Sequence, residues 1–320
     1  MTDPAPALAR PQPSPAALTS LLLGAASLLL PIIAGLPAVF VGHRALYAIN
    51  ASEGQLTGRR LAIAGMLLGL LTTVVAGAGF IVLIFVNVAQ KSRSVECKNN
   101  LSRIGFAVNI YQKTSADRTF PPAAIPNAVL PFGECLSWHS AILPALDQNR
   151  TAGKKWQSIY EKIDRQRAWS DPVNADAGDT VIAVFLCPGH PSYEPPVRPA
   201  PTHYVGIAGV GADAALLAKG DPRAGFFGYN RTITEGDVTA GTSHMLMVLE
   251  TAHDNGPWIA AGFPTVRDVP EIDPLLGPYA PFGGCHDGGA NALFVDGSVR
   301  FQSDSIDPQI LRALARLNRE

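Results

Sequence analysis

The side chains best suited to chemistry lie in a glycine-rich stretch near the end of the chain. His286 and Asp287 stand in this stretch, and Asn291 follows them. A further carboxylate, Glu250, ends an apolar run earlier in the chain. Such groups bind a cation or a polar ligand when the fold brings them together, and oxygen-rich glycine loops suit calcium. The stretch lacks the alternating aspartates of a recognised calcium motif. A structural role, with His286 bonded to buried backbone beside a sheet, is therefore the favoured alternative.

The pair Asp296-Gly297 marks a tight turn close to this loop. Apolar, β-prone residues flank it at 292–295 and 298–301. An Asp-Gly pair accepts the positive φ values that a two-residue type I′ turn requires. We therefore predict a β-hairpin over residues 292–302, in which Asp296 caps its own turn.

The cysteines follow the apolar part of the chain, at Cys97, Cys135, Cys187 and Cys285. Cys187 with His190, and Cys285 with His286, could offer zinc two thiolates and two imidazoles, but these spacings fit no standard structural zinc site. In an oxidising compartment the same cysteines would form disulfides, which is the favoured interpretation. Four cysteines allow three pairings, and spacing alone does not choose among them.

No motif of a known catalytic class stands out. A P-loop, a dinucleotide fingerprint and a zincin motif are all missing from the sequence. Gly241-Thr242-Ser243-His244 places a serine beside a histidine, but it lacks the second glycine of a nucleophile elbow, and neighbours on a strand point to opposite faces. We expect no enzymatic activity. The formal net charge of −1 provides no basic field for nucleic acid.

Two long uncharged runs lie in the first part of the chain, at residues 17–42 and 61–88. Each exceeds the roughly 20 residues that cross a hydrocarbon core of about 30 Å. Pro31 and Pro37 predict that the first helix is kinked or broken. A buried soluble helix or a cleaved signal peptide is the alternative, although a signal peptide has an apolar region of only about 7–15 residues.

The second run continues without a turn signal into residues 87–113. Apolar residues recur there at i, i+4, i+7, i+11 and i+14, namely Cys97, Leu101, Ile104, Val108 and Tyr111. This spacing places them on one face of a helix. We predict one long helix whose first half lies in lipid and whose second half lies on a soluble sheet.

These elements define the expected fold and its division. The fold class is α+β: two N-terminal transmembrane helices, the second continuous with a long amphipathic helix packed on an antiparallel sheet with long loop insertions. Residues 1–16, rich in Pro and Ala, form a disordered tail. Residues 17–88 form a two-helix membrane domain, and residues 89–320 form the domain that carries the loop and the hairpin. A short terminal helix is expected at Ile306–Leu317, capped by Asp304 or Ser305.

The pattern of His286, nine intervening residues and Asp296-Gly297 resembles the signature of the bacterial prepilin-type processing-associated H-x9-D-G family, a domain of unknown function. The likeness runs in order over residues 90–308, through Cys97-Lys98-Asn99-Asn100-Leu101, Phe120-Pro121-Pro122, Trp138, Phe185-Leu186-Cys187-Pro188 and Pro257-Trp258. The resemblance implies a pilin-like or pseudopilin-like domain. It also favours a Cys97–Cys187 disulfide, since both cysteines sit on family anchors. Cys135 and Cys285 are additions to the pattern and are expected to pair with each other.

Residues 15–85 resemble a small two-helix bacterial membrane domain, also of unknown function. Gly42-His43 precedes a basic loop, and Gly58-Arg59 precedes the second helix. A prepilin peptidase site, a Gly before Phe-Thr-Leu-x-Glu, does not precede residues 61–88. The membrane hairpin therefore replaces the cleavable leader of pilin-like members.

The expected location is the bacterial inner membrane, with two spans and an extracytoplasmic C-terminal domain. Basic residues stand both in the loop and after the second run, so the positive-inside rule does not choose the side. The cysteines and the pilin-like orientation favour the outside. The expected partners are the lipid bilayer and unknown envelope proteins. The expected function is that of a non-enzymatic structural or interaction protein related to pseudopilins, and the alternative is a ligand- or cation-binding sensor that uses the loop around His286.

Overall fold

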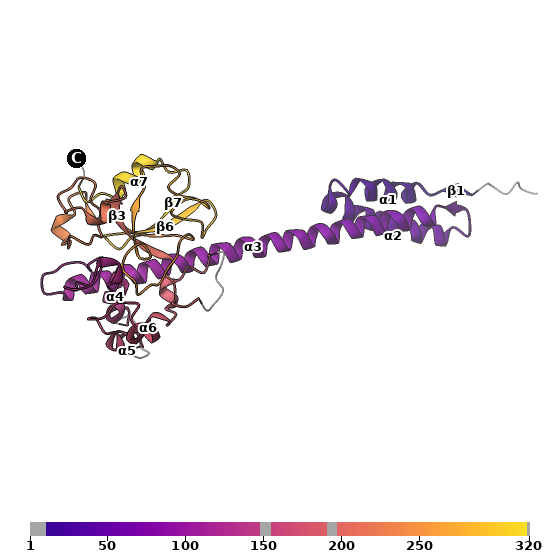
Figure 1. Cartoon of the computed structure of the whole chain (residues 1–320). Coiled ribbons are helices and arrows are strands. Elements are labelled where there is room, and N and C mark those ends of the chain that lie inside the picture. The colour runs from indigo at the N-terminus through magenta and orange to yellow at the C-terminus, as the bar shows by residue number, and fades with distance from the viewer. Residues whose placement is uncertain (1–10, 148–154, 191–196, 319–320) are drawn as a thin grey trace, which may run out of the picture. The chain divides into compact units, whose positions relative to one another are not determined.

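The computed structural model describes residues 11–147, 155–190 and 197–318. The chain is α+β, with long helices and a mixed sheet (Figure 1). It divides into two compact units, residues 1–89 and 90–320. The long helix α3 (Arg59–Thr114) contributes its first part to one unit and its last part to the other. Most of the predicted tail lies outside the described residues.

The first unit is built from closely packed helices. α1 (Pro15–Ala26) packs along α2 (Pro31–Ala51), and the Ser20 hydroxyl donates to the Ala38 carbonyl at 2.9 Å. Glycines let the helices approach: a Cβ added to Gly24 would lie 2.7 Å from the Gly65 carbonyl oxygen. Small residues at helix contacts are typical of membrane helices. Two short strands, β1 (Gln12–Pro13) and β2 (Leu56–Thr57), pair in parallel.

The first apolar run does not form one helix. α1 ends at Ala26 and α2 begins at Pro31, because a proline has no N–H to donate and is favoured in the first turn of a helix. The predicted break is therefore found, but the helix that follows it runs to Ala51 and includes part of the expected basic loop. α2 and α3 are long and apolar enough to cross a membrane by length and composition, whereas α1 has only 12 residues.

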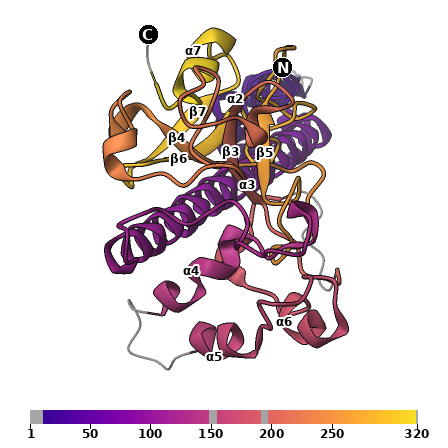
Figure 2. The same cartoon turned by 60° about the vertical axis from the view of Figure 1, so that its left-hand side comes forward.

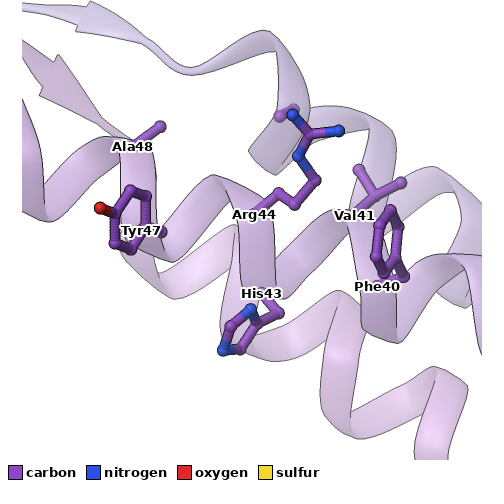
Figure 3. Close-up of a pocket in the computed structure, with 7 residues that line it drawn as sticks. Phe40, Val41, His43, Arg44, Tyr47 and Ala48 are labelled. Carbon is purple, nitrogen blue, oxygen red and sulfur yellow. The ribbon is translucent and has the colours of Figure 1, made fainter.

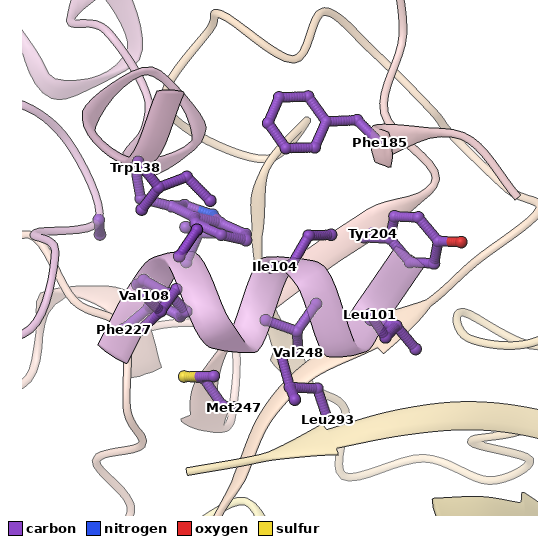
Figure 4. Packing of buried hydrophobic residues seen from close by; sticks show 14 of the residues in the cluster. Leu101, Ile104, Val108, Trp138, Phe185, Tyr204, Phe227, Met247, Val248 and Leu293 are labelled. Carbon is purple, nitrogen blue, oxygen red and sulfur yellow. The ribbon is translucent and has the colours of Figure 1, made fainter. Parts of the chain in front are cut away.

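The last part of α3 forms one wall of the core of the second unit. Cys97, Leu101, Ile104 and Val108 are fully buried, as their helical spacing predicts, and Tyr111 is partly buried. Figure 4 shows Leu101, Ile104 and Val108 on this helix, facing large side chains from the rest of the unit. The labelled partners are Trp138, Phe185, Tyr204, Phe227, Met247, Val248 and Leu293.

The five-stranded sheet has the order β5-β3-β4-β6-β7. Its strands are β3 (Tyr204–Val210), β4 (Leu246–Glu250), β5 (Val266–Val269), β6 (Gly289–Phe294) and β7 (Val299–Ser303). The prediction of an antiparallel sheet is wrong at one edge, because β5 pairs in parallel with β3. β5 follows β4 in the chain but lies on the far side of β3, so it runs opposite to β4 and with β3.

The sheet lies between two helical layers. On β3, Tyr204 and Ala208 belong to the cluster that contains α3, whereas Val205 and Ile207 belong to the cluster that contains Leu311. Leu311 comes from α7 (Pro308–Leu314), which covers the other face (Figure 2). The predicted terminal helix is thus present, but its cap is Asp307, whose side chain accepts from Gln309 N–H, and not Asp304 or Ser305.

Short helices and single helical turns complete the second unit. They are α4 (Trp138–Leu146), α5 (Lys155–Lys162) and α6 (Ala175–Gly178), with single 3₁₀ turns at Phe132–Glu134, Pro172–Asn174, Ala183–Phe185, Ala214–Leu216, Glu235–Asp237 and Thr242–His244.

The predicted hairpin is β6 and β7, but its turn is not type I′. Gly297 has a φ of +83°, whereas Asp296 does not have a positive φ. The Phe294 carbonyl accepts from Gly297 N–H at 2.9 Å, and Phe294 N–H donates to the Ser298 carbonyl. This is a three-residue loop with a left-handed glycine at its third position. The Asp296 side chain accepts from Ser298 N–H at 2.9 Å, so it does cap its own turn.

Candidate functional site

A disulfide between Cys97 and Cys187 ties α3 to the loop after the 3₁₀ turn at 183–185. The two Cα atoms are 5.2 Å apart and both side chains are fully buried. One turn further along α3, the Asn100 amide donates to the Leu186 carbonyl at 3.0 Å. The helix and the loop are therefore held together by a covalent bond and by a hydrogen bond beside it.

His286 lies directly against this disulfide. Its Nε2 atom is 3.2 Å from Cys187 Sγ and 3.6 Å from Glu250 Oε2. The ring is nearly closed off from solvent, with 7% of the side chain exposed. A Cβ on Gly189 would lie 2.5 Å from the imidazole Cε1, so a glycine is required where the Cys187 loop passes the ring.

Glu250 ends β4 and is completely buried. Its Oε1 accepts from Asn291 N–H at 2.7 Å, and the Asn291 side-chain amide lies 3.4 Å from both carboxylate oxygens. A buried carboxylate needs such donors, because removing it from water without them is strongly unfavourable. The central strands β4 and β6 thus orient the carboxylate toward His286.

Tyr204 completes the group from the start of β3. Its hydroxyl is 3.0 Å from Cys97 Sγ, and its backbone pairs with Glu250 across the sheet. Burial, reinforced by the Glu250 carboxylate, raises the pKa of the Tyr204 phenol well above its usual value. The hydroxyl therefore keeps its proton at neutral pH.

The predicted ligand residues are only partly brought together. His286, Glu250 and Asn291 lie together, and Cys97 and Cys187 join them. Asp287 is exposed and accepts from the Gln90 amide at 3.0 Å, so it takes no part in the group.

The two halves of the predicted signature lie at opposite ends of β6. Asp296 and Gly297 form the hairpin turn after Phe294, whereas His286 precedes Gly289. A strand of this length separates them by roughly 20 Å. They therefore serve two separate places in the fold.

Sequence reasoning missed Tyr204 and the contact between the disulfide and His286. Cys187 and His286 are 99 positions apart, and no local periodicity reports such a contact. The one available signal was that both belong to the same ordered set of anchor residues.

The second expected disulfide is wrong, since Cys135 and Cys285 are both free and buried. Cys135 packs in a small cluster with Ala124 and Ala261, whereas Cys285 belongs to the main core. Burial, followed by the charge of Glu250, raises the pKa of the Cys285 thiol. The two thiols are buried in separate clusters, so they do not meet.

Three histidines accompany the Cys187 loop. His203 Nδ1 accepts from Cys187 N–H at 3.0 Å, and its ring stacks on His190 with centroids 3.9 Å apart. Burial, and then the neighbouring His190, lowers the pKa of His203 to about 3. His139 is fully buried, and this burial lowers its pKa well below 6.5. These rings are therefore neutral parts of the core at neutral pH.

Two surface cavities are lined by other residues than this group. One of about 600 Å³ runs along α2 in the first unit, where Figure 3 shows Phe40, Arg44 and Tyr47 around it. The other, of about 280 Å³, is polar and lies beside the hairpin turn, with Asn109 and Asp296 in its lining.

Comparisons with known proteins identify one family. A family model described as a protein of unknown function (DUF1559) matches residues 88–266 and 259–309, which together span more than half of the chain. No curated protein and no solved structure matches the chain.

Proposed function

We propose that this chain, which belongs to the DUF1559 family of proteins of unknown function, is a membrane-anchored envelope protein. In this proposal α2 and α3 cross the bacterial inner membrane, and residues 90–320 form an extracytoplasmic domain that acts by contact with other envelope proteins. The domain is pseudopilin-like and has no enzymatic activity.

The apolar surface of α3 carries this proposal. Between residues 67 and 88, large apolar side chains around the helix are each 47–71% exposed, namely Leu67, Leu70, Leu71, Val74, Val75, Phe80, Ile81, Val82, Leu83, Ile84, Phe85, Val86 and Val88. Soluble proteins rarely leave apolar patches of more than a few hundred Å² in water. Residues 59–88 form about 45 Å of helix, enough for a hydrocarbon core of about 30 Å. Lipid is the solvent that fits this surface.

The flanks of the apolar segments support two spans. Arg59 and Arg60 precede the apolar part of α3, and Lys91 and Arg93 follow it. On α2, Arg44 and the exposed Tyr47 stand near the C-terminal end. Basic and aromatic side chains of this kind are enriched at membrane interfaces.

The disulfide supports an extracytoplasmic second unit. Cys97 and Cys187 both lie in residues 90–320, and disulfides persist in oxidising compartments but not in the cytosol. A pseudopilin-like role is supported by the packing of a long helix on a sheet, with α3 against β3, β4 and β6. The residues with the strongest chemistry, Glu250 and His286, are buried away from any substrate, which favours function by surface contact.

Paired reporter fusions to the full chain test this topology. A periplasm-dependent reporter placed after Glu320 should be active, and a cytoplasm-dependent reporter there should be silent. The matched control is the same pair inserted at Gly54, between α2 and α3, where the activities should reverse. The protein should also stay with the membrane after extraction at high pH. A cytoplasmic reporter active after Glu320 contradicts the outside placement, and release at high pH contradicts the spans.

A further inference from the structure

We propose that Cys97, Cys187, His286 and Glu250 form a zinc-binding site that becomes available when the Cys97–Cys187 disulfide is reduced. The same cluster then has two exclusive states, a disulfide or a bound metal ion. This goes beyond the anchoring role and does not depend on it.

The four possible ligand atoms already converge. Two sulfurs, one imidazole nitrogen and one carboxylate oxygen all lie within 4.8 Å of one another. They come from α3, from the loop after residue 185, from the end of β4 and from the loop before β6. Because separate elements of the core hold them, little rearrangement is needed to make the group.

The spacing suits a tetrahedral ion. Zinc binds sulfur at about 2.3 Å and nitrogen or oxygen at about 2.0–2.2 Å, which places neighbouring ligand atoms about 3.3–3.8 Å apart. His286 Nε2 is 3.2 Å from Cys187 Sγ and 3.6 Å from Glu250 Oε2. The remaining change is between the sulfurs, which must move apart once their bond is broken.

The chemistry of the donors selects zinc over the calcium expected from the loop alone. Calcium takes six to eight oxygen ligands, whereas this group offers sulfur, nitrogen and a single carboxylate. Thiolate and imidazole ligands favour zinc and similar ions. With Asp287 pointing to solvent, the oxygen-rich set is not assembled here.

The surroundings resemble the outer shell of a metal site. Asn291 holds the Glu250 carboxylate through its backbone N–H, and the Tyr204 hydroxyl lies 3.0 Å from Cys97 Sγ. Such partners orient the ligands and strengthen binding. Glu250 is fully buried, accepts from Asn291 N–H and lies 3.6 Å from the His286 ring nitrogen. A divalent cation would offset two of the three negative charges that this carboxylate and two thiolates carry.

The conversion balances with a dithiol as the reductant. A dithiol delivers two electrons and two protons to the Cys97–Cys187 bond, which becomes two thiols while the dithiol becomes a disulfide. Zinc then binds both sulfurs as thiolates and releases their two protons to solvent. Reoxidation by a disulfide compound, which takes the two electrons and two protons and becomes a dithiol, re-forms the Cys97–Cys187 bond and expels the ion.

The test uses the full chain in detergent micelles, reduced with dithiothreitol and freed of it without air. Zinc is added, unbound ion is removed, and bound zinc per chain is measured in reduced and oxidised samples. We expect about one zinc per reduced chain and none per oxidised chain. Cobalt added instead should give the sulfur-to-cobalt charge-transfer absorption and the visible bands of a tetrahedral site.

Variants assign the ligands. Cys97→Ser with Cys187→Ser should abolish zinc binding, and Glu250→Gln should weaken it by more than about tenfold. The matched controls are Asp287→Asn in the same loop, and Cys135→Ser with Cys285→Ser, which should both bind like the wild type. Circular dichroism before and after zinc addition reports folding, and a reduced chain that refolds only with zinc also supports the proposal. Reduced protein that binds no zinc overturns it, whether folded or not, and so does zinc binding that survives loss of Cys97 and Cys187.

Discussion

Two stretches of the same helix use their large apolar side chains in opposite ways. Around residues 67–88 of α3, large apolar side chains are exposed on all sides, and the contacts of the first unit are made by alanine and glycine, as at Ala17, Ala45 and Ala62. From residue 97 onward, Cys97, Leu101, Ile104 and Val108 turn inward as one stripe, and side chains such as Lys98 and Ser102 face out. The comparison teaches that one helical backbone can carry two different side-chain patterns, and that the pattern decides which surroundings suit each stretch.

We expect the largest effect on stability from removing the disulfide that joins the second stretch to the rest of its unit. Cys97→Ala with Cys187→Ala opens a loop with a sequence separation of 90 residues. In the chain-entropy model, loss of such a bond lowers the free energy of unfolding by about 4–5 kcal/mol. Chemical unfolding of the full chain in micelles, followed by tryptophan fluorescence, measures it. Cys135→Ala is the control, and equal loss in both variants would show that the bond contributes nothing special.

A charge in the first stretch tests the lipid side of the comparison. Val75→Lys places a charge in the middle of the exposed apolar part of α3, which disfavours insertion by about 2.5–3.5 kcal/mol. We expect a smaller membrane fraction in cell fractionation. Lys98→Val, in the exposed part of the second stretch, is the reverse control and should leave the membrane fraction unchanged. An unchanged fraction for Val75→Lys would mean that water, not lipid, surrounds this stretch.

Acid should weaken the second unit, since its core holds neutral histidines. The pKa of His203 is about 3 when folded and about 6.5 when unfolded. Below pH 6.5 the unfolded chain takes up a proton that the folded chain refuses, so stability is complete above that pH and falls toward pH 3. At pH 5 the loss from this residue is about 2 kcal/mol.

Melting temperatures between pH 7.5 and 5 measure this effect. His203→Asn keeps an acceptor for Cys187 N–H and should flatten the pH dependence, whereas the exposed His244→Asn should not. A wild-type curve that does not change with pH would contradict the assignment.

We expect the smallest loss of stability from a substitution in the hairpin turn. Gly297 has a φ of +83°, and a β-branched residue there costs about 1–2 kcal/mol in backbone strain. Gly297→Val should lower the free energy of unfolding by that amount, measured by chemical denaturation. Gly220 has an ordinary φ and open space around it, so Gly220→Val should have little effect. A similar loss in both variants would remove the conformational explanation.

Local patterns predicted the helices better than the sheet. The spacing of Cys97, Leu101, Ile104 and Val108 indicated the buried face of α3, because helical periodicity depends only on residues that are close in the sequence. The parallel pairing of β5 with β3 depends on which side of the sheet the chain crosses, and no short-range signal records that. The turn at Asp296 follows the same logic, since its type depends on the register of the flanking strands.

The candidate site was predictable only in part. Glu250, His286 and Asn291 were expected together because they have suitable chemistry near one loop. Their contact with the disulfide joins segments 99 positions apart, which a single sequence does not reveal. Pairing Cys135 with Cys285 as two additions to the family pattern failed because burial in separate clusters also accounts for a free thiol.

The position of the disulfide also determines how the chain carries mechanical load. A pull applied between the α3 side and the C-terminus would pass from Cys97 through the sulfur bridge to Cys187. While the bond is closed, the pulling force passes through the disulfide and does not pass along residues 98–186. Reduction would put that whole length, with α4, α5 and α6, into the line of force and lengthen the extensible chain.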